Sequence, residues 1–146
     1  MMTVLVIDDS MTVRAIIEQI LEGEPDLAVI ASASDVPTAR ALIARHAPSV
    51  ITLDLAMPGI DGLAFLDELA SGPHAPVLVV SSHTKPDSAA ELDALGRGAA
   101  GCFDKARLVS EGRKFARVLR KAAHRKLSTI HQRALAPITA GTPLPA

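Results

Sequence analysis

The chain has 146 residues, a size that fits one domain with a substantial apolar core. Hydrophobic residues make up 49% of it, but there is no Trp or Tyr and only three Phe, so Val, Leu, Ile and Ala must build the core. The single Cys102 excludes an internal disulfide, and no apolar run approaches the ~20 residues that span a bilayer. Acids at positions 8 and 9, with no basic region before them, argue against a signal peptide. We therefore expect a cytoplasmic protein.

The net charge of −1 hides a strong asymmetry along the chain. Residues 1–112 contain all 16 acids and seven of the 15 Lys and Arg, a formal charge of −9. Residues 113–146 contain eight bases and no acid, a formal charge of +8. Such a division is typical of a partner surface or a nucleic-acid patch, but also of a solvated face on a terminal helix.

Five short apolar runs recur at a spacing of about 24 residues. The first four are rich in Val, Ile and Leu without alternation, which predicts strands that are covered on both faces. The runs occupy residues 3–7, 27–31, 50–53 and 77–80, with a weaker one at 100–103.

Helical patterns fill the intervals between these runs. Apolar residues at helical spacing predict helices over 10–22 and 36–46, a third from about 61, a fourth from about 87 and a fifth from about 109 or 110. This alternation predicts an α/β fold, a (βα)5 doubly wound parallel sheet with the flavodoxin-like strand order 2-1-3-4-5. Residues 136–146 contain three Pro and a Gly, which predict a flexible tail.

Three carboxylates follow the ends of two strands of this sheet. Asp8 and Asp9 close the first apolar run, and Asp54 closes the third. In the predicted order these two strands are neighbours, and open α/β sheets bind ligands at this edge. Two carboxylates ~4 Å apart repel by about 4 kcal/mol at an effective dielectric constant of ~20, so the cluster requires a cation. Oxygen-only donors favour a hard ion, and we expect Mg²⁺.

Four short motifs in the right order and spacing resemble those of two-component receiver domains. They are Val-Ile-Asp-Asp-Ser at 6–10, Leu-Asp-Leu-Ala-Met-Pro-Gly at 53–59 with Asp-Gly at 61–62, Val-Ser-Ser at 80–82 and Phe-Asp-Lys at 103–105. The resemblance covers roughly residues 3–125 and implies the receiver fold. It is closest to the receiver domain of chemotaxis methylesterases, because of residues 57–63 and 80–84. The methylesterase domain is absent, so we expect no enzyme beyond the chain's own phosphoryl transfer and dephosphorylation.

The resemblance implies a role for each residue near the three carboxylates. Asp54 would be the phosphoacceptor, taking a phosphoryl group from a phosphohistidine. Asp9 would bind Mg²⁺ directly and Asp8 through water. The other implied Mg²⁺ ligands are Asp54 itself and the backbone carbonyl of Ala56. The residues that would contact the phosphoryl oxygens are Lys105 and Ser81.

One position departs from the family pattern. Position 102, which usually holds Tyr or Phe, is Cys. In the family that ring moves inward when the hydroxyl of the fourth strand moves toward the phosphate. Phe103 cannot easily replace it, because adjacent residues of a strand face opposite sides of the sheet. Whether the usual ring switch operates therefore stays open.

The resemblance implies a stand-alone regulator with two kinds of protein partner. A sensor histidine kinase or a phosphotransfer protein would donate the phosphoryl group, and a downstream protein would bind the fourth helix, the fifth strand and the fifth helix. We take residues 1–125 as the receiver domain. Because the apolar stripe of the basic fifth helix continues beyond it, we predict that 126–135 is a helical extension that docks on a partner or on a second copy, as a homodimer. No membrane partner is expected.

Several other readings remain alternatives. A degenerate receiver would act as an interaction module without phosphorylation. The basic helix at 113–133 could bind nucleic acid, although no helix-turn-helix or stacking aromatic supports this.

Three further hypotheses require motifs that the sequence lacks. A haloacid-dehalogenase-type phosphatase needs a second Asp at position 10, which is Ser. A dinucleotide-binding domain needs a Gly-rich turn after the first strand, and none exists before Gly23. His124 and His131 lie outside any recognisable phosphotransfer motif.

Overall fold

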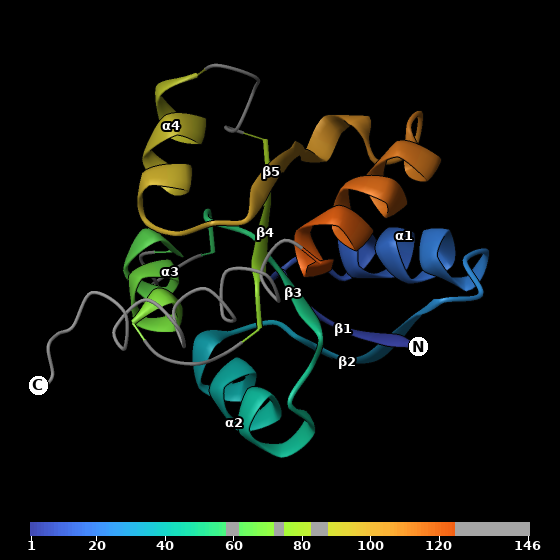
Figure 1. Ribbon diagram of the computed structural model, residues 1–146, viewed down its shortest axis with the longest axis horizontal. Coiled ribbons are helices and arrows are strands. Elements are labelled where there is room, and N and C mark those ends of the chain that lie inside the picture. Colours follow the sequence, from blue (N-terminus) through green and yellow to red (C-terminus); the bar gives the residue numbers. More distant parts are fainter. Residues whose placement is uncertain (58–61, 72–74, 83–87, 125–146) are drawn as a thin grey trace, which may run out of the picture.

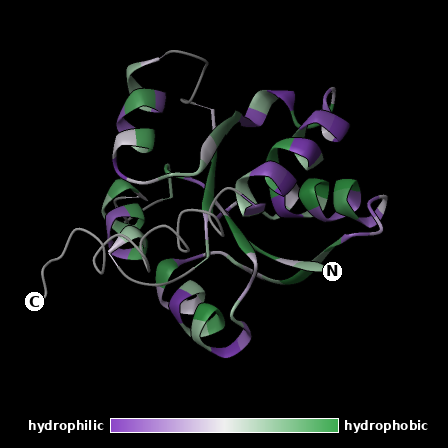
Figure 2. Cartoon of the chain, in the orientation of Figure 1, coloured by the Kyte–Doolittle hydropathy of each residue, from purple (hydrophilic) through white to green (hydrophobic). Residues whose placement is uncertain are grey.

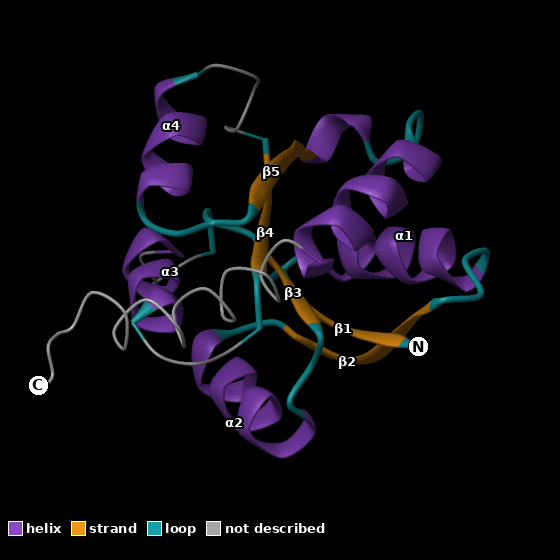
Figure 3. Cartoon of the chain, viewed as in Figure 1, coloured by secondary structure: helices purple, strands orange, loops and turns teal. Residues whose placement is uncertain are grey.

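The strands form one five-stranded sheet with the predicted order. The computed structural model describes residues 1–57, 62–71, 75–82 and 88–124. Neighbouring strands are all parallel, and their order is β2-β1-β3-β4-β5 (Figure 1, Figure 3). The strands are β1 (Met2–Ile7), β2 (Leu27–Ala33), β3 (Val50–Leu53), β4 (Val77–Ser81) and β5 (Gly101–Asp104).

Helices connect successive strands, and α1 and α2 begin after side chains that cap them. Ser10 accepts a hydrogen bond from the backbone N–H of Val13 at the start of α1, and Asp35 accepts one from Thr38 at the start of α2. Gly23 ends α1, as predicted. The helices are α1 (Met11–Glu22), α2 (Val36–His46), α3 (Gly62–Ala70), α4 (Ala89–Gly96), the 3-10 helix η1 (Lys105–Arg107) and a last helix described over 112–124.

The helices cover both faces of the sheet. α1 and the helix at 112–124 pack on one face, and α2, α3 and α4 pack on the other (Figure 1). Alternate residues of each strand supply the two cores, so that Val4 and Val6 face α1 whereas Leu5 and Ile7 face α2. The strands are strongly hydrophobic along most of their length (Figure 2), which explains why their apolar runs show no alternation.

Phe103 and Cys102 lie on opposite sides of β5, as the strand geometry predicts. The Phe103 ring packs edge-on against Phe115 in the core under the helix at 112–124, with 5.3 Å between ring centroids. Cys102 lies half-buried against the other core, beside α4. Burial raises the pKa of the Cys102 thiol to about 12, and the negative charge of Glu91 adds to the shift. Phe103 is therefore a core residue and cannot take the place of a ring at position 102.

The last helix differs from the prediction in its first residue. It begins at residue 112 rather than near 109 or 110, because η1 and a turn over 108–111 come first. Asp104 starts η1 by accepting a hydrogen bond from the backbone N–H of Ala106, and the turn buries Leu108 in the core. The predicted extension at 126–135, the predicted tail at 136–146 and Asp61 lie outside the described residues.

Candidate functional site

The predicted site residues meet at the carboxyl end of the sheet. Ile7 of β1 pairs with Leu53 of β3, so the residues that follow them, Asp8 and Asp54, leave the sheet side by side. Ser81 is the last residue of β4, and Lys105 begins η1 directly after β5. Lys105 contacts both Asp8 and Asp54, and Ser81 ends β4, the strand between β3 and β5.

The three acids form a compact cluster. Asp8, Asp9 and Asp54 each offer a carboxylate oxygen, and these oxygens lie within 4.8 Å of one another. Asp8 and Asp54 are 2% exposed, whereas Asp9 is open to solvent. In the described part of the chain this is the one group of three or more His, Cys, Asp or Glu side chains that could hold a metal ion. The donors are all hard oxygens, which fits a hard divalent cation.

Asp8 is held from three sides. Its Oδ1 accepts a hydrogen bond from the backbone N–H of Ser10 at 2.8 Å, and its Oδ2 lies 3.0 Å from the Lys105 ammonium. Its backbone carbonyl accepts a hydrogen bond from the Arg14 guanidinium at 2.7 Å. Sequence reasoning missed Arg14, since a basic residue on the first helix gives no sign that it reaches back to the strand end.

Asp54 is the carboxylate whose ionisation the site opposes. Burial raises the pKa of Asp54 above its usual range, and the negative charge of Asp8 adds to the shift. Two contacts act in the opposite direction: the backbone N–H of Ala56 donates to Oδ1 at 3.0 Å, and the Lys105 ammonium lies 3.3 Å from Oδ2. A group bound to Oδ2 would therefore lie close to a positive charge.

Lys105 is the cation of the cluster. Its burial lowers its pKa, but the hydrogen bond to Asp8 and the charges of Asp54 and Asp8 outweigh this and raise the pKa above the ordinary lysine value. Lys105 is therefore fully protonated at neutral pH. One ammonium stands against three carboxylates, so the site keeps a negative charge that a further cation would reduce.

The remaining predicted residues lie at the same edge. Ser81 is fully buried at the end of β4, and Ala56 is exposed in the loop after β3. Gly62 lets the start of α3 approach this loop, because a Cβ at position 62 would lie 2.5 Å from the Cα of Leu55. Any larger residue there would displace the loop that carries Ala56.

Comparison with known proteins agrees with the fold. Residues 4–115 match the family model of the response regulator receiver domain. Since this match covers most of the chain, the protein belongs to the response regulator receiver domain family. Across the described residues, no helix is both long and apolar enough to cross a membrane.

Curated relatives of the chain are larger proteins. It is 41% identical over 145 residues to the protein-glutamate methylesterase/protein-glutamine glutaminase 2 of Pseudomonas aeruginosa, an alignment that covers 98% of this chain and 40% of that protein. It is 38% identical to the corresponding protein of Bordetella pertussis, with coverage of 97% and 41%. The chain thus spans about two fifths of the length of these relatives.

Solved structures show the same fold. The response regulator domain of Thermotoga maritima CheB has a TM-score of 0.78 and 28% identity, over 84% of this chain and 96% of that one. A chain in the complex of the CheA3 P1 domain with CheY6 from R. sphaeroides has a TM-score of 0.71 and 28% identity, over 83% and 95%. Both are similar to this chain over nearly its whole described length.

Proposed function

We propose that this chain is a phosphoacceptor regulator of a two-component or phosphorelay pathway, phosphorylated on Asp54 by a histidine kinase or a phosphotransfer protein. The main support for this proposal is the position of the Asp54 carboxylate in the sheet. Its carboxylate is buried at the carboxyl end of β3, 3.3 Å from the Lys105 ammonium, in one cluster with Asp8 and Asp9. The complex of CheA3 P1 with CheY6 supports a phosphotransfer domain as the class of donor.

The donor set fits Mg²⁺, which would neutralise charge on the transferring phosphoryl group. We assign Asp9, Asp54 and the backbone carbonyl of Ala56 as direct ligands, and Asp8 as a ligand through water. Asp9 suits a direct ligand because it is the exposed member of the cluster. Asp8 contacts Ser10 and Lys105 through its two oxygens, and its role through water follows the family resemblance.

The chain's own residues would supply the rest of the chemistry. A carboxylate oxygen of Asp54 forms a bond to phosphorus while the P–N bond of the donor phosphohistidine breaks, and the electron pair stays with the imidazole. Lys105, already beside Oδ2, would place its positive charge against the phosphoryl oxygens. Ser81, at the end of the neighbouring strand β4, would offer them its hydroxyl.

The proposed role is regulatory rather than catalytic. The family match covers residues 4–115, and the described residues of the site all fall within it. We propose that the chain acts as a regulator that signals through α4, β5 and the helix at 112–124. Two large apolar side chains, Leu92 and Leu95, are exposed on α4, which suits a protein-binding surface.

We also propose residues 1–125 as the receiver domain and 126–135 as a helical extension that docks on a partner protein. A chain that lacks 126–146 should fold and be phosphorylated like the full chain, because α1, the sheet and the site lie within 1–124. It should bind its cognate kinase more weakly than the full chain in a titration. Equal affinities would show that the extension makes no such contact.

Incubation with acetyl phosphate and Mg²⁺, followed by intact mass measurement, tests the assignment of Asp54. The wild type should gain one phosphoryl group, and Asp54→Asn should gain none. Asp104→Asn is the matched control, because Asp104 also ends a strand at this edge but caps η1 and lies outside the cluster. It should be phosphorylated like the wild type. A labile phosphoryl group on Asp54→Asn would place the site elsewhere.

A further inference from the structure

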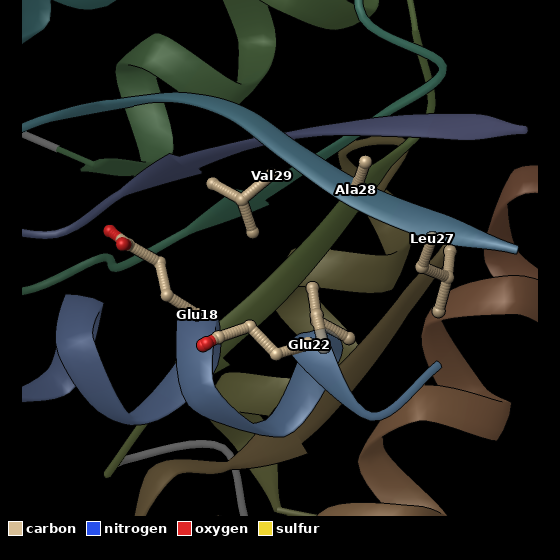
Figure 4. A pocket seen from close by; sticks show the side chains of 6 residues that line it. Glu18, Glu22, Leu27, Ala28 and Val29 are labelled. Carbon is tan, nitrogen blue, oxygen red and sulfur yellow. The ribbon is translucent and has the colours of Figure 1, made fainter. Parts of the chain in front are cut away.

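An acid-rimmed groove lies between α1 and the edge strand β2 (Figure 4). Its volume is about 380 Å³, and Glu18 and Glu22 stand at its rim one helical turn apart. Neither carboxylate has an ion-pair or hydrogen-bond partner in the described part of the chain. Arg14, one turn before Glu18, donates to the carbonyl of Asp8 instead. The groove is lined by Glu18, Leu21, Glu22, Leu27, Ala28 and Val29.

A row of unpaired cations lies on the helix at 112–124. Arg113, Arg117 and Lys121 follow one another at every fourth position and are exposed. None of them forms an ion pair with a described residue. Arg120, which points toward the turn after α1, is by contrast held by Asp26 at 2.5 Å. Arg120 thus has partners within its own chain, whereas this row has none among the described residues.

The two rows have matching spacing and opposite charge. Residues four apart on a helix lie about 5–6 Å from each other, so Glu18 and Glu22 repel, as do Arg117 and Lys121. An opposite charge from outside the chain would relieve each repulsion. Because both rows repeat once per helical turn, Arg117 and Lys121 can meet Glu18 and Glu22 in register when the two helices lie side by side.

The rows cannot meet within one molecule. The acidic groove lies at the β2 edge of the sheet. Lys121 lines a cavity of about 170 Å³ with Ala100, Val118 and Ala122, next to the β5 edge. β2 and β5 are the two opposite edges of the sheet, so the acidic and basic surfaces lie at opposite ends of the face that α1 and the helix at 112–124 share.

We propose that a second copy of this chain is the partner. Arg117 and Lys121 of one copy dock on Glu18 and Glu22 of the next. The contact joins two different surfaces, so it is head-to-tail, and a pair of copies keeps one free acidic surface and one free basic surface. The groove and the helix face are small compared with a stable interface, so the association is weak and depends on salt. It requires neither phosphorylation nor Asp54.

Charge reversal of each surface tests this contact, with sedimentation of the full chain at low ionic strength and about 0.1 mM protein, where a weak interface of this size is populated. The wild type should sediment above the monomer mass and return to it at about 0.5 M NaCl. Glu18→Lys with Glu22→Lys, and Arg117→Glu with Lys121→Glu, should each remain monomeric. A 1:1 mixture of these two variants should associate again. The glutamate variant is then basic at both surfaces and the Arg117 and Lys121 variant is acidic at both, so every contact between the two variants joins opposite charges.

Arg45→Glu is the control for a reversed charge, since Arg45 is exposed on α2, on the other face of the sheet. It should associate like the wild type. The proposal is wrong if the wild type stays monomeric at low salt, if either double reversal still associates, or if the mixture does not. A wild type that stays monomeric but binds a polynucleotide would assign the cationic row to nucleic acid instead.

Discussion

The ammonium group of Lys105 lies 3.3 Å from Oδ2 of Asp54, although 51 positions separate the two residues in the chain. The same ammonium lies 3.0 Å from Asp8. The contact depends on the order of the sheet, which places the carboxyl ends of β1, β3, β4 and β5 in one row. One partly buried cation thus compensates part of the charge of the acid cluster and lies where a phosphoryl group on Asp54 would place its oxygens.

Lys105→Met should slow phosphorylation by acetyl phosphate. Removal of one preorganised charge from a phosphoryl-transfer site costs on the order of 100-fold in rate. The measurement is the rate at which the phosphorylated mass appears at fixed Mg²⁺. Lys114→Met, which removes a half-exposed lysine of the last helix, should leave the rate unchanged. Equal rates for Lys105→Met and the wild type would contradict the role of Lys105.

Asp54→Asn should stabilise the metal-free protein at neutral pH. Because burial and Asp8 raise the pKa of Asp54, its ionised form is less favourable in the folded chain than in the unfolded chain. The wild type therefore loses stability relative to Asp54→Asn as the pH rises, beginning at the ordinary pKa of a carboxyl group and ending above the raised pKa of Asp54. The melting temperatures of the two proteins should coincide near pH 3. By pH 7 the melting temperature of Asp54→Asn should be the higher of the two. A lower melting temperature for Asn at pH 7 would contradict this account.

Much of the fold and the site could be predicted because both follow from local pattern. The apolar runs give the strands, Ser10 and Gly23 mark the ends of α1, and Asp8 and Asp54 follow strands that the topology makes neighbours. Features that depend on long-range packing could not be predicted. The pairing of Arg120 with Asp26 joins residues 94 positions apart, and the groove beside Glu18 exists only because α1 packs along β2.

Mg²⁺ should raise the melting temperature of the wild type. Binding to the folded chain stabilises it by RT ln(1 + [L]/Kd), so the rise should grow with the logarithm of Mg²⁺ once the site fills. Asp9→Asn should respond less, and Asp104→Asn should respond like the wild type. An unchanged melting curve up to roughly tens of millimolar Mg²⁺ would mean that the cluster is not a metal site.

Thr52→Val should stabilise the protein. Thr52 lies in the middle of β3, 1% exposed, and its hydroxyl is the one buried side-chain polar atom among the described residues that has no hydrogen-bond partner. A buried unsatisfied hydroxyl costs about 1–3 kcal/mol, and Val has nearly the same shape. Urea unfolding should show a gain of about 1 kcal/mol or more. Thr12→Val, at an exposed position of α1, should change stability little, and a loss of stability in Thr52→Val would reveal a partner for the hydroxyl.

Reductive trapping identifies the residue that carries the phosphoryl group, which we expect to be Asp54. Borohydride reduces an acyl phosphate to an alcohol, which converts a phosphorylated Asp into homoserine. After phosphorylation with acetyl phosphate and Mg²⁺, reduction and proteolysis, mass spectrometry of the peptides should find homoserine at position 54 and Asp at positions 8 and 9. Homoserine at another position, or at none in a chain that had gained a phosphoryl group, would show that Asp54 is not the phosphoacceptor.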